Sequence, residues 1–233
     1  MKKTAAFAAA LLVLATPVLS QSIGGEVGIE YNAPLDGDDF GGTVYKLGFE
    51  YNFAQPVSIG VTGVGFNPDF IDENGSNVTL HASYHLNDFT SVGLFYAVDS
   101  LDGDDLDMIG LEAGTEVYGG IVNGYVGRAK ADDETGYAFG ADSEYGLANG
   151  FSALLEFDAV AADFADVTNF AIGAEYEIQS GPNFYAKLGH YNIDTDEGSF
   201  DQTYVTVGVD VAFGPKRGTT FESRSLLEII PGF

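Results

Sequence analysis

No cysteine occurs anywhere in this sequence. A small secreted module held together by disulfide bonds is therefore excluded, and a metal site would have to use histidine or carboxylate ligands. Basic residues are also scarce, since 9 lysines and arginines stand against 35 aspartates and glutamates. A chain with this excess of negative charge is not expected to bind nucleic acid or an anionic membrane surface.

Long apolar runs are missing after the first twenty residues. Within residues 1–20, Lys2 and Lys3 precede an apolar stretch and a segment of small residues that ends at Ser20. This order predicts a secretory signal peptide cleaved after Ser20, because the apolar stretch is shorter than the roughly 20 residues of a spanning helix. No later run is long enough for such a helix, so the mature chain could cross a membrane only with strands.

Alternation of apolar and polar residues is abundant instead. It is clearest in residues 202–213, where every second residue from Thr203 to Phe213 is apolar or Thr and the residues between are polar or small. Strict period-two alternation predicts an extended strand with one apolar face. Asp210 lies among valines in this segment, which suits a strand with lipid on one side and water on the other.

The same pattern predicts twelve strands of about the length that a tilted transmembrane strand needs. An even number of strands in a meander can close, so that no strand edge is left unpaired in lipid. We therefore predict an all-β fold, a closed antiparallel up-and-down transmembrane β-barrel over residues 21–213. The predicted strands are 22–32, 43–53, 57–66, 77–86, 89–98, 108–118, 121–129, 137–147, 151–161, 167–178, 184–193 and 202–213.

The predicted connections alternate between short and long. The short ones are 54–56, 87–88, 119–120, 148–150 and 179–183, and the long ones are 33–42, 67–76, 99–107, 130–136, 162–166 and 194–201. Nearly all the acidic residues of the connections fall in the long set. This segregation favours a membrane barrel with long outer loops and short periplasmic turns over a soluble barrel.

In this architecture residues 21–213 resemble the Gram-negative outer-membrane porin-like β-barrel proteins. Phe213 at the end of the last strand and Phe233 at the chain end are both similar to the C-terminal phenylalanine that serves barrel assembly in that family. The resemblance implies an outer-membrane location, contact with outer-membrane lipid and with the barrel-assembly machinery, passage of small hydrophilic solutes or cations, and a possible homo-oligomer. General-diffusion porins differ in having more strands and a long infolded loop.

The strand phasing predicts a charged set of side chains inside the barrel. Rings of carboxylates favour cations, so we expect a cation-preferring diffusion channel whose lumen residues set its selectivity. The alternative is a structural or interaction barrel that does not conduct, because twelve strands lie between the roughly 8 that side chains fill and the roughly 16 that leave an open channel. The predicted lumen residues are Glu26, Glu30, Lys46, Glu50, Glu112, Glu116, Arg128, Asp142, Glu144, Glu156, Asp158, Glu175, Glu177, Lys187 and Asp210.

Enzymatic and metal-binding functions have weak support. No acidic loop has EF-hand spacing or a nonapeptide repeat, so neither form of calcium binding is predicted. His81 and His85 are about 13 Å apart along one strand, too far to chelate one ion. Ser83 lies between them, but residues two apart in a strand rarely place a nucleophile against its base. We expect no catalysis, metal or cofactor.

Residues 214–233 form a tail of different composition, with three of the basic residues that remain after cleavage at Ser20. Ser225 and Glu228 have the spacing of a capping box, which predicts a helical turn before Pro231. The sequence leaves two placements open for this tail: it hangs in the periplasm, or it folds into the acidic lumen as a basic plug.

Overall fold

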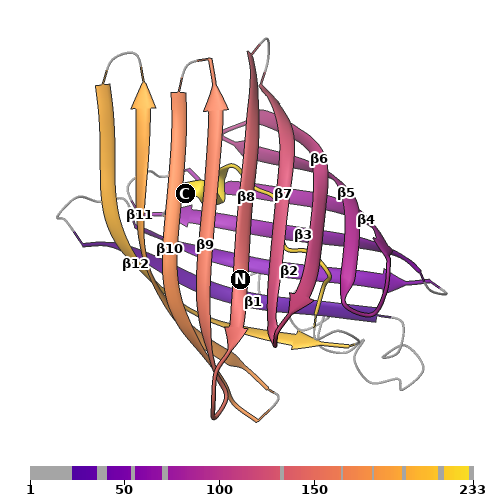
Figure 1. Cartoon of the computed structure of the whole chain (residues 1–233). Helices are drawn as coiled ribbons and strands as arrows, with labels where there is room; N and C mark the ends of the chain where they lie inside the picture. The colour runs from indigo at the N-terminus through magenta and orange to yellow at the C-terminus, as the bar shows by residue number, and fades with distance from the viewer. Residues whose placement is uncertain are drawn as a thin grey trace, which may run out of the picture.

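The computed structural model describes residues 23–35, 41–53, 56–69, 73–131, 134–163, 165–179, 181–195, 198–214 and 218–230. The predicted signal peptide and Phe233 lie outside these residues. Twelve antiparallel strands form one closed barrel, in which β1 pairs with β12 (Figure 1), so the predicted fold class is confirmed. The strands are β1 (Ile23–Pro34), β2 (Gly42–Asn52), β3 (Val57–Pro68), β4 (Gly75–His85), β5 (Thr90–Leu101), β6 (Asp104–Val117), β7 (Gly120–Ala131), β8 (Glu134–Gly146), β9 (Phe151–Ala162), β10 (Ala165–Glu177), β11 (Asn183–Thr195) and β12 (Gly198–Phe213).

The outer face of the barrel is apolar. Large side chains such as Leu80, Leu111 and Val207 point outward and leave about half of their surface uncovered. An apolar surface that surrounds a whole barrel far exceeds the patches found on soluble monomers, and it matches a lipid-facing belt. In the described part of the chain, no helix is long and apolar enough to cross a membrane.

Closure of the barrel depends on the last strand. β12 pairs with β1 from Gly25 opposite Phe213 to Pro34 opposite Tyr204. The Phe213 ring lies over Gly25, where an added Cβ would be only 2.4 Å from the ring, and meets the edge of the Phe49 ring on β2 at a centroid distance of 6.3 Å. The missing side chain at Gly25 therefore lets one aromatic ring tie three neighbouring strands together at the seam.

Four connections predicted to be long are short in the structure. β5 and β6 are joined by Asp102 and Gly103 alone, both with positive φ, as a type I′ hairpin turn requires. Residues 132–133, 163–164 and 196–197 likewise separate their strands, so the predicted alternation in loop length is wrong there. In the described parts of these segments, acids such as Asp99, Asp104 and Asp166 lie on the extended strand ends. Strand pairing continues there because cross-strand hydrogen bonds, such as Ser100 Oγ to Asp105 Oδ1 at 2.5 Å, satisfy polar side chains.

The predicted inward direction of Arg128 is also wrong. Arg128 pairs with Ile109 on β6 and Tyr137 on β8, which are 62% and 60% exposed on the outer face. The inward residues of β7 include Asn123, Tyr125 and Ala129 instead. Both faces of this strand mix small and apolar residues, so its periodicity alone does not show which face is inward. Arg128 lies near the end of the strand, where a long cationic side chain on the outer face reaches polar surroundings.

The C-terminal tail lies inside the barrel, between the front and back walls in the view of Figure 1. It contains a one-turn 3-10 helix, η4 (Leu227–Ile229). Leu226 packs against a cluster of buried residues on β5 to β8 that includes Phe95 and Met108. Leu227 packs against a second cluster on β2 and β3 that is formed by Val44, Val64 and Phe66. The apolar core of the protein therefore lies within the lumen, where the tail meets the wall.

Candidate pore site

Fourteen of the fifteen predicted lumen residues face inward, as the strand registers show. Their phase is continuous around the barrel from Glu26 and Glu30 on β1, opposite Ala212 and Gly208, to Asp210 on β12. The inward set is Glu26, Glu30, Lys46, Glu50, Glu112, Glu116, Asp142, Glu144, Glu156, Asp158, Glu175, Glu177, Lys187 and Asp210. Their surroundings differ, because the tail covers some of them and leaves others open.

Arg224 is the centre of the tail's attachment to the wall. Its side chain is 5% exposed, and its Nε donates a 3.1 Å hydrogen bond to Glu112 Oε2 on β6. The other Glu112 oxygen lies 2.8 Å from His81 Nδ1, and His81 Nε2 lies 3.1 Å from Thr62 Oγ1. The guanidinium also lies over the ring of Tyr125 at 4.8 Å. A buried charge is costly unless it is paired and hydrogen-bonded, and these contacts meet that requirement for Glu112.

The tail backbone is bound on both sides of Arg224. The Arg224 N–H donates to Thr79 Oγ1 at 3.1 Å, and its carbonyl accepts from Asn77 Nδ2 at 3.3 Å. One residue later, Ser225 Oγ and the Leu226 N–H donate to the two carboxylate oxygens of Asp99 at 2.5 and 3.0 Å. Asp99 was predicted to lie in an outer loop, but it is a buried inward residue of β5.

Two further anchors hold the ends of the tail. The Thr220 N–H and hydroxyl both donate to Glu50 on β2 at 2.8 Å. Glu228 in η4 forms a 3.0 Å salt bridge with Lys46 and accepts from Ser223 Oγ at 2.6 Å. The predicted helical turn is therefore present, but its N-cap residue is Leu226, and Ser225 binds Asp99 and the Leu227 N–H instead of acting as its cap.

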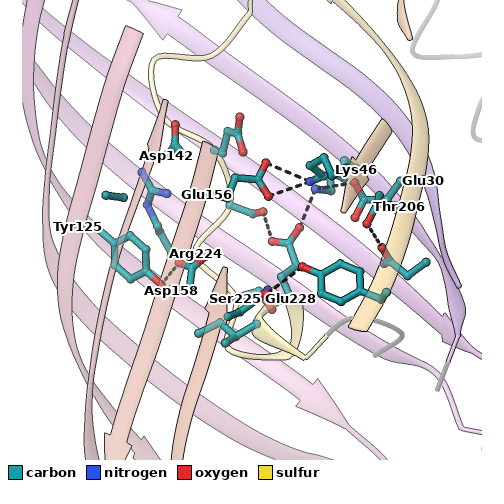
Figure 2. A pocket seen from close by; sticks show the side chains of 18 residues that line it. Glu30, Lys46, Tyr125, Asp142, Glu156, Asp158, Thr206, Arg224, Ser225 and Glu228 are labelled. Atoms are coloured by element: carbon teal, nitrogen blue, oxygen red, sulfur yellow. Dashed lines mark hydrogen bonds and ion pairs between the residues drawn. The ribbon is translucent and has the colours of Figure 1, made fainter. Parts of the chain in front are cut away.

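A polar cavity of about 100 Å³ remains between the tail and the wall (Figure 2). Figure 2 shows Asp142, Asp158 and Arg224 on one side and Lys46 and Glu30 on the other. The charged residues that line it are Glu30, Lys46, Asp142, Glu156, Asp158, Lys187, Glu222, Arg224 and Glu228. Six acids and three bases give the lining a formal charge of 3 − 6 = −3. Such a lining is suited to water and to solutes that carry positive charge.

Several acids of the cavity are already neutralised. Lys46 Nζ lies 3.3 Å from Glu30 Oε2, which also accepts from Tyr185 OH at 2.7 Å. Lys187 Nζ lies 3.0 Å from both oxygens of Glu156. The long tyrosine side chain crosses the inner face at Gly208, where a Cβ would be 2.4 Å from the Tyr185 hydroxyl. Glycine at this position is therefore required for the Tyr185–Glu30 contact.

Ser83 does not form a nucleophile–base pair with His81 or His85. His81 is bonded to Thr62 and Glu112, and the ring nitrogens of His85 lie 3.1 and 2.7 Å from the hydroxyls of Ser58 and Ser91. The hydroxyl of Ser83 is buried and has no hydrogen-bond partner within the described residues. Among all the residues that the structure describes, no group of three or more His, Cys, Asp or Glu side chains is placed to hold a metal ion.

Comparisons with known proteins agree with this geometry at the level of the fold. No family model and no curated protein matches the chain. The KdgM porin in complex with disordered oligogalacturonate superimposes with a TM-score of 0.60 at 15% identity, over 81% of this chain and 99% of that one. The COG4313 outer membrane channel from Pseudomonas putida F1 gives 0.60 at 12% identity, over 83% and 96%. This chain has the fold of the outer-membrane channel barrels.

A third barrel of this kind, a TodX mutant described as a monoaromatic hydrocarbon channel, gives a TM-score of 0.56 at 9% identity, over 88% of this chain and 94% of that one. The predicted resemblance to outer-membrane porin-like barrels is thus confirmed for the fold. Identities this low show the fold alone and carry no residue roles across, so the site of this barrel rests on its own side chains.

Sequence reasoning missed the residues that seat the tail in this barrel. Thr62, Asn77 and Thr79 face inward and are almost completely buried, although they were not predicted to have a role. One signal was available: the inward rows of two neighbouring segments, residues 57–68 and 75–85, contain no aspartate, glutamate, lysine or arginine. An uncharged stretch of an otherwise acidic lumen is typical of a wall that is covered.

Proposed function

We propose that the protein is a channel in the outer membrane of a Gram-negative bacterium, through which small hydrophilic solutes diffuse passively, with a preference for cations. The observation that carries the proposal is the partly filled lumen: the tail covers one part of the wall, and a charged cavity remains beside it. A structural barrel would be more stable if that space were packed with apolar side chains, because charged groups in a lumen cost free energy unless water reaches them.

The cation preference is supported by the balance of inward charges. The predicted set now holds twelve acids against Lys46 and Lys187, since Arg128 faces outward. The tail adds Arg224 but also Glu222 and Glu228. A lumen with this excess of carboxylates attracts cations and repels anions. No covalent chemistry is part of the proposal.

Planar-bilayer recording of the refolded full-length barrel tests the proposal. Current steps are expected, and under a salt gradient the reversal potential should have the sign of cation flow. The absence of current steps would overturn the channel, and a reversal potential of anion sign would overturn the cation preference alone. The KdgM structure contains oligogalacturonate, so inhibition of the current by an oligogalacturonate is a useful further probe.

A barrel that does not conduct and displays acidic surface is the second candidate. It is favoured by one observation: the tail crosses the lumen from the wall of β5 and β6 to β10, and the cavity beside it is only about 100 Å³. The same recording separates the two candidates, because this barrel gives no current in the wild type but gives current steps once the tail is released.

We further propose that residues 1–20 are removed as a signal peptide and that the assembly machinery recognises Phe213. Phe213 ends the closing strand on the outer face, packed over Gly25. Replacement of Phe213 by alanine should lower the yield of barrels that resist denaturation in gels, whereas Phe233→Ala should not. The opposite result would assign assembly to Phe233. Gel filtration of the same detergent-extracted samples tests for a homo-oligomer.

A further inference from the structure

Three carboxylates of the cavity differ from the rest in having no cationic partner. Within the described residues, no lysine, arginine or histidine nitrogen lies within 4.0 Å of the carboxylates of Asp142, Asp158 or Glu222. The other acids that line the cavity, Glu30, Glu156 and Glu228, are each bound to a lysine. The unbalanced negative charge of the cavity is therefore carried by three side chains from β8, β9 and the tail.

Neutral hydrogen-bond donors fix the two wall carboxylates in position. Asn123 Nδ2 on β7 donates to Asp142 Oδ2 at 2.8 Å, and the Tyr125 hydroxyl on the same strand donates to Asp158 Oδ1 at 2.8 Å. Gly140 on β8 leaves the space for the second contact, because a Cβ there would be 2.1 Å from Asp158 Oδ1. Neither donor carries a charge of its own, so these hydrogen bonds hold the orientation of both carboxylates without placing a cation beside them.

The third carboxylate is held in the lumen by the tail. Glu222 lies between two anchors: Thr220 is bound to Glu50, and Arg224 is bound to Glu112, Thr79 and Asn77. Phe221, the residue before Glu222, is 2% exposed and stacks on His81 at 6.5 Å. With Phe221 and Arg224 buried against the covered wall, Glu222 is left exposed toward the cavity.

We propose that the tail is one wall of a selectivity constriction, in which Glu222 faces Asp142 and Asp158 across the cavity and these three carboxylates determine the preference for cations. The paired acids have a different role: Glu112, Glu50 and Asp99 attach the tail, and Glu30 and Glu156 hold the lysines. This inference rests on the proposed channel function and names its selectivity residues.

Single charge-removing substitutions in the full-length chain test the proposal. Asp142→Asn, Asp158→Asn and Glu222→Gln keep nearly the same shape, and the matched control is Asp166→Asn, which removes the same charge from the outer face of β10. Reversal potentials are recorded under a salt gradient at pH about 9, where carboxylates in such surroundings are ionised. We expect each lumen substitution to lower the cation-to-anion permeability ratio by about threefold, and the control to leave it unchanged.

Each outcome decides one claim. If the wild type gives current steps but the three lumen substitutions leave the permeability ratio unchanged, the selectivity constriction is overturned and the channel stands. If only the wall substitutions change the ratio, the part assigned to the tail is overturned. If the wild type gives no current, the channel function itself fails. Comparing Asp142→Asn with Asp142→Glu, which should keep the ratio, separates loss of charge from altered packing.

Discussion

The inner wall of this barrel has two unlike regions. On β3 to β6, beneath the tail, most inward residues are small, apolar or neutral and buried, as Thr62, Thr79 and Phe95 illustrate, and the buried acids Asp99 and Glu112 are bound to the tail. On β8 to β12 many inward residues are charged or tyrosine side chains around a cavity, as with Asp142, Glu156 and Lys187. Both regions have the same strand periodicity. The difference shows that periodicity determines which side chains face inward, whereas the composition of the inward row indicates whether water or protein covers them.

Removal of the Arg224 charge should have the largest effect on the contact between the tail and the covered wall. Arg224→Met leaves Glu112 buried beside His81 without its guanidinium partner, a loss that costs about 3–5 kcal/mol in comparable buried pairs. The tail should leave the covered wall, and the single-channel conductance should rise. Chymotrypsin should then cleave after Phe221, which is protected while that side chain is buried.

Arg128→Met is the matched control for that substitution, because Arg128 is an exposed arginine on the outer face. It should change neither the conductance nor the cleavage at Phe221. If Arg224→Met behaved in the same way as this control, the Arg224–Glu112 pair would not be what attaches the tail.

Truncation of Phe221 should weaken the same attachment through packing. Phe221→Ala removes a buried ring that stacks on His81, and a phenylalanine truncated in a core costs about 3 kcal/mol or more. We expect brief transitions to the conductance level of Arg224→Met. Phe89→Ala, at an exposed turn, should change stability by no more than about 0.5 kcal/mol and give the wild-type trace. A wild-type trace from Phe221→Ala would show that the covered wall does not depend on apolar contact.

A smaller effect is expected from Asp99→Asn. The carboxylate accepts hydrogen bonds from Ser225 Oγ, the Leu226 N–H and Asn77 Nδ2, and the amide can keep only part of this set. The loss should be about 1–3 kcal/mol, as for hydrogen bonds to a charged group. Ser225→Ala removes one of these bonds and should release the tail less often than Asp99→Asn. Equal conductance traces in both variants and the wild type would contradict the role of Asp99.

Much of the barrel could be predicted from the sequence because one physical rule acts along every strand: lipid excludes charge from the outer face. The rule failed for Arg128, which lies near a strand end beyond the reach of that exclusion, and for Asp99, which continues a strand where acidic composition had suggested a loop. The exclusion of charge from the outer face gives no information about where the tail lies. Arg224 meets Glu112, a residue 112 positions earlier, and no local pattern records such a contact.

The smallest expected effect is the pH dependence of ion selectivity, because it depends on one side chain, Glu222, at the border of the two regions. Poor hydration inside the barrel and the nearby carboxylates of Asp142, Glu26 and Glu156 raise the pKa of Glu222 to about 8, although Lys46 opposes them. Glu222 is therefore mostly neutral at pH 6, and it gains its negative charge as the pH rises through about 8. The cation-to-anion permeability ratio should increase over this interval by less than about threefold, and Glu222→Gln should remove that increase. An equal increase in the substituted barrel would assign the titration to the carboxylates of the wall.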